Sequence, residues 1–373
     1  MTAKETKPVI LCVVGARPNF VKMAPIMDAM SRDGCLVARL VHTGQHYDAE
    51  MNDFFFVDLG MPRPDVNLTV GSGTHAVQTA DVMTRFEPIL DEFRPDAVLV
   101  VGDVNSTLAA SLVAAKKEVP VIHVEAGLRS YDRTMPEEIN RVLTDQISDY
   151  LFTTERSAEV NLWREGISAE KIHFVGNVMI DALQRCLPHA TPPEKTLAKL
   201  GQTNTSGYAV ATLHRPSNVD DARTLAALLG AFAKIGGVLP IIFPLHPRTR
   251  ARIDAAGLGQ FLQSPAINVA NPLGYLDMLG LVSGASLVLT DSGGLQEETT
   301  ALGIPCFTLR ANTERPVTVE QGTSILVGNS PDRLLAAFDD LRRNGGKKGN
   351  RPELWDGHAA ERIVAILGEK FVS

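Results

Sequence analysis

Acidic residues stand where several predicted strands end, and this placement suits general acid–base chemistry. Asp103 ends the apolar run DAVLVVGD, and Glu125 ends PVIHVE. Glu137 and Glu138 open a predicted helix after Pro136. Carboxylates on neighbouring strand ends would share one pocket, where crowding raises the pKa of one of them and lets it hold a proton near neutral pH. Two structural alternatives stay open: a loop amide satisfies Asp103 or Glu125, and the other two are ordinary first-turn helix acids.

The segment TDSGGLQEE has the composition of a phosphate-binding turn. Ser292, Gly293 and Gly294 follow a predicted strand and precede a predicted helix. Amide N–H groups at the positive end of a helix form a cradle for a diphosphate. Glu297 and Glu298 would repel a phosphate, so we expect one of them to accept hydrogen bonds from ribose hydroxyls. The alternative is an ordinary N-cap, because serine caps helices without any ligand.

Basic residues follow the same and other predicted strand ends, where they could bind an anionic substrate. Arginine suits this role because its guanidinium forms paired hydrogen bonds with phosphate. The candidates are Arg17 and Lys22 after the first run, Arg129 in EAGLRS, His214 and Arg215 in TLHRPSN, His246 and Arg248 in FPLHPRTR, and Arg310 and Arg315 in TLRANTERP. Each taken alone has a structural alternative, such as a solvent-exposed arginine or a strand-end histidine that bonds only within the fold. His123-x-Glu125 is similar to a zinc deaminase fragment, but the P-C-x-x-C partner is missing, so we expect no metal.

The elements that must position these residues are short apolar runs alternating with helix-length amphipathic segments. The runs include residues 8–15, 36–44, 96–103, 120–127, 149–154, 208–214, 240–246 and 286–294. Continuous runs of valine, isoleucine and leucine are typical of parallel strands covered on both faces. Their alternation with helices predicts an α/β fold with doubly wound sheets, in which ligands bind at the carboxyl ends of the strands.

A polar, proline-containing stretch after residue 178 separates two series of strands and indicates two Rossmann-like domains. We predict an N-terminal domain of residues 1–178 with 357–373, and a C-terminal domain of residues 179–356. The last helix would cross back to pack on the first domain. A chain of 373 residues is long enough for two hydrophobic cores.

Composition narrows the class of protein further. The net charge of -7 argues against a nucleic-acid partner, which would call for a basic excess. The N-terminal MTAKETKP has no apolar signal core, and the longest apolar runs are strand-sized, so we expect a cytoplasmic protein without membrane contact. The four cysteines have no metal-binding spacing and are interpreted as free thiols.

Taken together, ten segments in order resemble the non-hydrolysing UDP-N-acetylglucosamine 2-epimerases. They are GARPNFVKMAP, HTGQHYD, GDVNSTLAA, HVEAGLRS, MPEEINRVLTD, TLHRPSNV, FPLHPRTR, PLGYLDM, TDSGGLQEE and LRANTERP. The resemblance implies the GT-B-like fold, in which two doubly wound Rossmann-like domains with parallel sheets enclose a deep interdomain cleft. It also implies a homodimer, a UDP-sugar substrate and no cofactor.

The resemblance implies a reversible inversion at C2 by anti elimination of UDP and re-addition through 2-acetamidoglucal. Acid–base positions fall on Asp103, Glu125 and Glu137, and His214 falls beside the diphosphate. The remaining matches fall on substrate-binding positions: Arg17, Lys22, Arg129, His246, Ser292, Gly293, Gly294, Glu298 and Arg315.

Three alternatives stay open on the sequence. The GARPN form also occurs in relatives that epimerise diacetamido-uronic acid nucleotides. A GT-B glycosyltransferase that moves a sugar from UDP, or a regulator that only binds a sugar nucleotide, would share the fold. Gln45 and His46 match part of a second nucleotide site that activates some relatives, but no arginine between Asn67 and Gln78 completes it.

Overall fold

The computed structural model describes residues 7–45, 58–202 and 207–372 and divides into two compact units. Unit 1 comprises residues 1–185 and 353–373, and unit 2 comprises residues 186–352. The sequence placed these boundaries at 178 and 357. Helix α7 (Val178–Cys186) accounts for the first difference, because nearly all of it belongs with unit 1.

Among the described residues, unit 1 holds a seven-stranded sheet in the order β3-β2-β1-β4-β5-β6-β7, with every printed pairing parallel. Its strands are β1 (Val9–Val14), β2 (Val37–His42), β3 (Val66–Asn67), β4 (Ala97–Val101), β5 (Val121–Ala126), β6 (Tyr150–Thr153) and β7 (Ile172–Phe174). Its helices are α1 (Arg17–Asp33), α3 (His75–Phe93), α4 (Asn105–Lys116), α5 (Pro136–Ile147), α6 (Arg156–Arg164), α7 and α16 (Ala359–Phe371).

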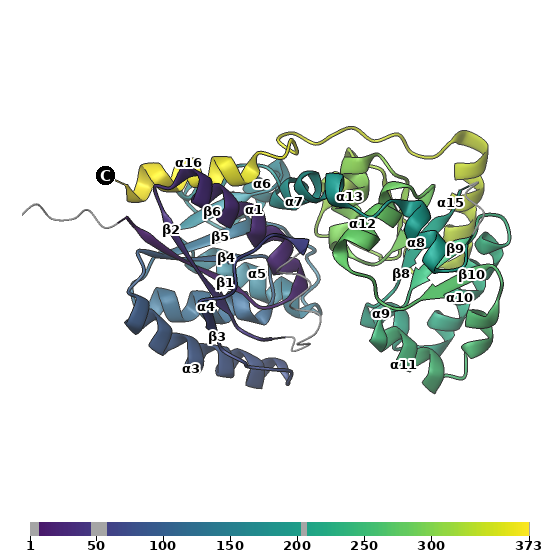
Figure 1. The fold of residues 1–373 in the computed structure, drawn as a ribbon, viewed down its shortest axis with the longest axis horizontal. Helices are drawn as coiled ribbons and strands as arrows, with labels where there is room; N and C mark the ends of the chain where they lie inside the picture. The colour runs from purple at the N-terminus through teal and green to yellow at the C-terminus, as the bar shows by residue number, and fades with distance from the viewer. Residues whose placement is uncertain (1–6, 46–57, 203–206, 373) are drawn as a thin grey trace, which may run out of the picture. The chain divides into compact units, whose positions relative to one another are not determined.

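Helices cover both faces of this sheet. Helices α1 and α16 pack together on one face, and α3 and α4 pack together on the other (Figure 1). The central strands β4 and β5 are therefore buried along their whole length, which explains their unbroken apolar sequences. The C-terminal helix does cross back to unit 1, as the sequence predicted.

Among the described residues, unit 2 holds a six-stranded parallel sheet in the order β10-β9-β8-β11-β12-β13. Its strands are β8 (Ala209–Thr212), β9 (Ile241–Pro244), β10 (Ile267–Ala270), β11 (Leu287–Thr290), β12 (Cys306–Thr308) and β13 (Ser324–Leu326). Its helices are α8 (Pro193–Lys199), α9 (Pro216–Val219), α10 (Ala222–Gly236), α11 (Pro247–Ala255), α12 (Tyr275–Ser283), α13 (Gly293–Leu302), α14 (Pro316–Glu320) and α15 (Pro331–Asn344).

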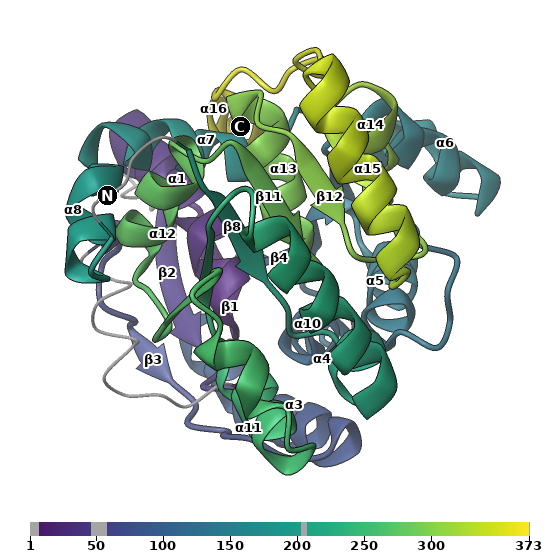
Figure 2. The ribbon, with the colours of Figure 1, turned by 90° about the vertical axis from the view of Figure 1, so that its right-hand side faces the viewer.

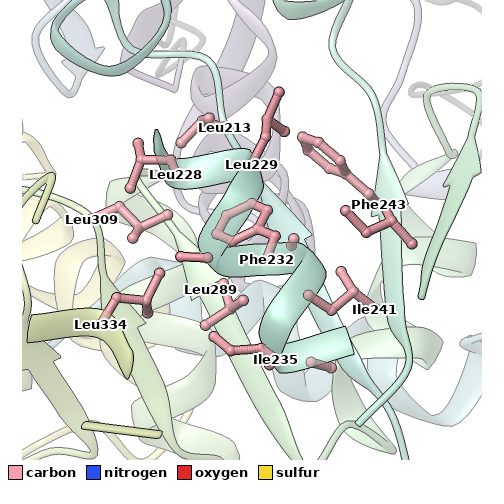
Figure 3. Close-up of a cluster of buried hydrophobic side chains, with 14 of the residues drawn as sticks. Leu213, Leu228, Leu229, Phe232, Ile235, Ile241, Phe243, Leu289, Leu309 and Leu334 are labelled. Carbon is pink, nitrogen blue, oxygen red and sulfur yellow. The ribbon is translucent and has the colours of Figure 1, made fainter. Parts of the chain in front are cut away.

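The core of unit 2 shows the two-residue period of a strand. Leu287 and Leu289 of β11 point to the same side as Phe232 of α10 and Leu334 of α15, whereas Val288 packs on the opposite face. Figure 2 shows α10 and α15 lying over one face of the sheet, and Figure 3 shows the side chains packed between α10 and the strands. Burying each such side chain contributes about 1.5–3 kcal/mol, so the sheet is a rigid base for the loops at its carboxyl edge.

The predicted α/β fold with two doubly wound parallel sheets is confirmed. The eight predicted runs correspond to strands, while the short strands β3, β7, β10, β12 and β13 fall outside those runs. No helix in the described parts of the chain is long and apolar enough to cross a membrane. All four cysteines are free thiols.

Candidate active site

The ends of β4 and β5 lie side by side in unit 1 and bring two predicted acids to one edge of the sheet. The backbone N–H of Gly102 donates to the carbonyl of Val124 at 3.1 Å, so Asp103, just after β4, and Glu125, near the end of β5, lie at the paired ends of these strands. Gly102 has φ +69°, a conformation that glycine adopts without strain. A Cβ at Gly102 would lie 3.4 Å from Glu125 Oε2. The turn before Asp103 therefore lies directly against the carboxylate of Glu125.

Glu125 is held in an unusual backbone conformation. Its φ is +71°, in the left-handed region where a non-glycine residue is strained by about 1–3 kcal/mol. Its carboxylate forms an ion pair with Lys22 Nζ from α1, and both side chains are buried. Such strain persists only where surrounding contacts impose it, and it is concentrated at functional sites. Lys22 and Glu125 thus form a preorganised buried charge pair.

Helix α5 supplies the partners of Asp103. Arg141 Nη2 and Nε contact Asp103 Oδ2 at 2.5 and 3.2 Å. Arg141 Nη1 also contacts Glu138 Oε2 at 2.5 Å, and Glu138 accepts hydrogen bonds from the backbone of Ser130 and Tyr131. The carboxylate of Glu138 therefore holds the loop at Ser130 and Tyr131 in place.

Glu137, beside it on the first turn of α5, is half-buried. The part of the chain that the structure describes gives its carboxylate no hydrogen-bond or ion-pair partner. Of the two adjacent acids, Glu137 is the one available for a substrate.

The turn between β1 and α1 is built around Asn19. Its Oδ1 accepts hydrogen bonds from the backbone of Gly15 and Ala16 at 3.3 and 3.0 Å, and its Nδ2 donates to the carbonyl of Val101 at 2.8 Å. Asn19 therefore ties this turn to the end of β4. Arg17 begins α1 and is half-buried at this edge of the sheet.

Arg129 is buried, whereas a residue that contacts a substrate needs an exposed surface. Its guanidinium contacts Asp145 Oδ2 at 2.7 Å and Glu165 Oε2 at 2.6 Å, and only 1% of its side chain is exposed. Although burial alone would lower the pKa of Arg129, the two carboxylates raise it above its usual value. Direct contact with a substrate would require these ion pairs to break, so the geometry argues against that predicted role.

In unit 2, α13 begins where β11 ends, and the glycines lie at its first turn. Ser292 is the N-cap residue, yet its side chain makes no capping hydrogen bond. The alternative of an ordinary serine N-cap is therefore not supported by the geometry. A Cβ on Gly293 would lie only 2.6 Å from Arg315 Nη1, which places the arginine against the helix N-terminus. This end of α13 combines a helix dipole with a guanidinium, the composition of an anion site.

Arg315 is oriented by two buried carboxylates. Its Nε lies 2.8 Å from Glu297 Oε1, and its Nη1 forms an ion pair with Glu314. Burial would raise the pKa of Glu314, but Arg315 and Arg310 hold it well below its usual range. The ionised Glu314 and the neighbouring Glu297 keep the guanidinium in place beside Gly293.

His214 is oriented by Asp291 in a buried hydrogen-bond cluster. The Nδ1 of His214 lies 2.8 Å from Asp291 Oδ1, while the ring is 41% exposed. The other carboxylate oxygen accepts hydrogen bonds from the backbone of His214 and Arg215 and from Asn218. Burial would raise the pKa of Asp291, but the His214 side chain and the backbone N–H groups of Arg215 and His214 lower it to about 2. An ionised Asp291 fixes the ring so that Nε2 is directed away from the cluster.

His246 lies next to His214, with 5.8 Å between the ring centroids. It is the N-cap of α11, where its Nδ1 accepts a hydrogen bond from the backbone of Arg248 at 3.2 Å. Both predicted histidines of unit 2 therefore belong to one edge of its sheet.

Glu298 on α13 is buried and accepts a hydrogen bond from the hydroxyl of Tyr275 at 3.0 Å. Burial raises the pKa of Glu298 to about 7, although the Tyr275 hydrogen bond opposes this shift. A carboxylate that titrates near neutrality can accept hydrogen bonds from hydroxyl groups when ionised.

Several residues of these clusters were not singled out from the sequence. Arg141, Asp145, Asp291 and Tyr275 each orient a predicted residue or its loop. Arg141 and Asp145 stand four positions apart on one helix face, a spacing that sequence reasoning could have used.

The proposed activating site is only partly described. Gln45 Oε1 accepts hydrogen bonds from the backbone and hydroxyl of Ser106, whereas His46 lies outside the described residues. Across residues 7–45, 58–202 and 207–372, no group of three or more histidine, cysteine, aspartate or glutamate residues is arranged to hold a metal ion.

Two parallel, doubly wound sheets with polar residues at their carboxyl edges define a protein of the GT-B class. The sequence profile of the UDP-N-acetylglucosamine 2-epimerase family matches residues 28–368. The chain belongs to this family.

Two relatives of similar identity differ in substrate. The UDP-N-acetylglucosamine 2-epimerase of Methanocaldococcus jannaschii is 43% identical over 95% of this chain and 97% of its own. The UDP-2,3-diacetamido-2,3-dideoxy-D-glucuronate 2-epimerase of Pseudomonas aeruginosa is 44% identical over 96% of this chain and 99% of its own. Sequence identity alone does not separate the two substrates.

The fold agrees with that of solved relatives. The Methanocaldococcus jannaschii enzyme, crystallised with UDP-GlcNAc and UDP, matches with a TM-score of 0.89 at 43% identity, over 97% of this chain and 99% of that chain. The Neisseria meningitidis enzyme bound to UDP-GlcNAc matches with a TM-score of 0.87 at 29% identity, over 97% of this chain and 100% of that chain.

Proposed function

We propose that the protein catalyses the reversible C2 epimerisation of UDP-N-acetylglucosamine to UDP-N-acetylmannosamine. The observation that carries this proposal is the cluster at the carboxyl edge of the sheet in unit 1. There the Gly102–Asp103 turn lies against the Glu125–Lys22 pair. Acidic groups held at fixed positions by buried partners are what proton transfer at a carbon atom requires.

In the proposed reaction, a carboxylate removes the proton from C2 while the bond between C1 and the UDP oxygen breaks. The electron pair of the C2–H bond forms the double bond of 2-acetamidoglucal, and UDP leaves with the pair of the C1–O bond. Protonation of the opposite face of C2 and attack of UDP at C1 give the epimer. Each proton and electron pair is returned, so the reaction is redox-neutral. Asp103, Glu125 and Glu137 are assigned to the proton transfers.

Unit 2 is assigned the nucleotide. Ser292, Gly293 and Gly294 at the α13 N-terminus would bind the diphosphate, which leaves as an anion and needs several charge-assisted donors. His214 and His246 would support the same group, and Glu298 would accept hydrogen bonds from the ribose. Arg17, Lys22 and Arg315 would complete the contacts with the sugar and phosphates.

A second substrate has an observation in its favour. The Pseudomonas aeruginosa relative named for a diacetamido-glucuronate nucleotide is as similar to this chain as the Methanocaldococcus jannaschii enzyme. Asn19, the last residue of the GARPN form that also occurs in such relatives, is buried. Its side chain forms hydrogen bonds with backbone groups only, so it shapes the turn beside Gly102. A UDP-linked diacetamido-uronic acid is therefore the alternative substrate to be tested in parallel.

Proton NMR in heavy water tests the reaction and the substrate together. Incubation with UDP-N-acetylglucosamine is expected to give a UDP-N-acetylmannosamine signal and loss of the C2 proton signal in both sugars. The same incubation with the diacetamido-glucuronate nucleotide ranks the two substrates by rate. A folded chain that exchanges the C2 proton of neither sugar overturns the proposal, and sugar transfer to an added acceptor would indicate a glycosyltransferase.

The acid–base assignment is tested by single-atom changes. Asp103→Asn and Glu125→Gln are expected to lower the C2 exchange rate at least about 100-fold, with UDP affinity largely preserved because most of the proposed nucleotide contacts lie in unit 2. Glu92→Gln, on the exposed surface of α3, is the matched control and should leave exchange unchanged. Retained exchange in both site variants would show that other groups move the proton.

We also propose a cytoplasmic homodimer, because the proposed nucleotide substrate is cytoplasmic and α5 and α6 expose apolar side chains. Ile139 and Leu143 are four positions apart on α5, and Trp163 lies on α6; all three are exposed. Light scattering should give a dimer mass for the wild type and a monomer mass for Leu143→Asp. Val238→Asp, at an equally exposed position in unit 2, should remain dimeric.

A further inference from the structure

The turn that carries Asp103 is held from one side by a buried histidine. His123 Nε2 lies 2.8 Å from the carbonyl oxygen of Gly102, and its Nδ1 lies 2.7 Å from Asp145 Oδ1. The side chains of His123 and Asp145 are both fully buried. The carbonyl oxygen can only accept, so the ring must donate to it and is fixed by contacts at both nitrogens.

Asp145 is itself held by further partners. Its Oδ2 accepts a hydrogen bond from the backbone of Gly127 at 3.1 Å and pairs with Arg129 at 2.7 Å. Burial would raise the pKa of Asp145, but His123 and Arg129 lower it below its usual value. The histidine is thus backed by an ionised carboxylate that also secures the loop after β5.

The same turn is held from the other side by α5. Arg141 reaches Asp103 Oδ2 through two guanidinium nitrogens, and Asn140 Nδ2 donates to the carbonyl oxygen of Asp103 at 2.9 Å. The carbonyl of Gly102, the carbonyl of Asp103 and the carboxylate of Asp103 are therefore each fixed by a buried or part-buried donor. The turn Gly102–Asp103 is thus held by residues of both β5 and α5.

We propose that His123, Asp145, Asn140 and Arg141 form a turn clamp that positions the Asp103 carboxylate beside Glu125 for proton transfer. These are positioning residues, because they act on the reaction through Asp103. The inference deepens the proposed function and rests on it. It also gives Arg129 a role through Asp145 in place of substrate contact.

Three clamp variants test the proposal on the full-length protein. His123→Phe keeps a ring but removes both polar contacts, Arg141→Met removes the guanidinium, and Arg141→Lys keeps the charge without the paired geometry. Two matched controls change residues of unit 1 outside the clamp. They are His173→Phe on β7 and Arg85→Lys, whose guanidinium also holds loop carbonyls.

The kinetic readout separates positioning from folding. Because a misplacement of about 1 Å can cost about 100-fold in rate, kcat for C2 deuterium exchange should fall about 100-fold in His123→Phe and Arg141→Met. Their KM and UDP affinity should stay within about threefold of the wild type, since the nucleotide contacts are unchanged. Arg141→Lys should recover part of the rate, and both controls should match the wild type.

Amide hydrogen exchange gives a second readout that does not depend on turnover. Peptides covering residues 102–105 should exchange faster in the clamp variants, while peptides of the β1 strand should not. Unchanged kcat with unchanged amide exchange overturns the clamp, as does a kcat loss fully explained by lower UDP affinity or a smaller folded fraction. If wild-type protein exchanges no C2 proton, the proposed function fails; wild-type exchange with normal variants refutes the clamp alone.

Discussion

At the scale of single residues, the Glu298 carboxylate links nucleotide binding to pH. Its pKa of about 7 in the free protein means that it is about half protonated at neutrality. Only the ionised form can accept two ribose hydroxyls through its two oxygens. Binding of the nucleotide should therefore release a proton and strengthen as pH rises through 7.

Calorimetry can measure this linkage with UDP-N-acetylglucosamine, whose diphosphate diester does not titrate in this range. In an Asp103→Asn background, in which turnover is expected to be slowed at least about 100-fold, we expect affinity about tenfold weaker at pH 6 than at pH 8. Glu298→Gln should bind more weakly and lose the pH dependence. A pH dependence that survives the substitution would assign the proton to another group.

Gly293 is a second residue whose identity follows from its surroundings. A Cβ there would meet the guanidinium of Arg315 at 2.6 Å and the carboxylate of Glu314 at 3.0 Å, and both side chains are buried. Gly293→Ala should therefore displace Arg315, lower the free energy of unfolding by about 1–3 kcal/mol and weaken UDP binding. Gly259→Ala is the control, because nothing lies within 4 Å of its added methyl group. Urea unfolding and UDP titration of the two variants check this prediction.

At the scale of elements, one buried carboxylate binds the first turn of α16. Asp181 of α7 accepts hydrogen bonds from the backbone of Ala359 and Ala360 at 3.2 and 2.7 Å, at the first turn of α16. Burial raises the pKa of Asp181 to about 6, although these two donors oppose the shift. The raised pKa means that the folded state favours the protonated carboxyl more than the unfolded state does.

This shift determines how stability depends on pH. Between the unfolded value of 3.8 and the folded value of about 6, the folded state binds more protons, so the unfolding free energy falls as pH rises. The contribution of Asp181 should be about 1 kcal/mol larger at pH 5 than at pH 8. The Asp181→Asn variant should lack this pH-dependent contribution. The difference in unfolding free energy between wild type and variant should therefore be smaller at pH 8 than at pH 5. Urea unfolding at both pH values measures it, and a constant difference would contradict the prediction.

The same scale shows what the sequence could predict about the site. Asp103 and Glu125 were placed together correctly as strand ends, because parallel strands order their carboxyl ends along one edge. The contact of Arg141 with Asp103 was not foreseen, because it joins residues 38 positions apart through side-chain packing. The burial of Arg129 was also missed, since EAGLRS does not reveal that Asp145 and Glu165 will surround it.

At the scale of the whole molecule, each unit has its own sheet and core. Unit 2 is one uninterrupted segment, residues 186–352, whereas unit 1 is made of two segments, the second of which contains α16. The core of unit 2 is built from its own helices and strands, as the packing of Phe232 and Leu334 shows. A domain with a core of its own can fold in isolation.

The isolated segment 186–352 is therefore expected to fold cooperatively and to bind UDP. It contains the α13 N-terminus, His214, His246, Glu298 and Arg315, so most of the proposed nucleotide contacts are present. We expect UDP affinity within about tenfold of the full chain, a loss of about 1.4 kcal/mol, and no C2 exchange, because Asp103 and Glu125 are missing. The same segment with Gly293→Ala is the control for specific binding. A folded segment that does not bind UDP would show that the nucleotide contacts were assigned to the wrong unit.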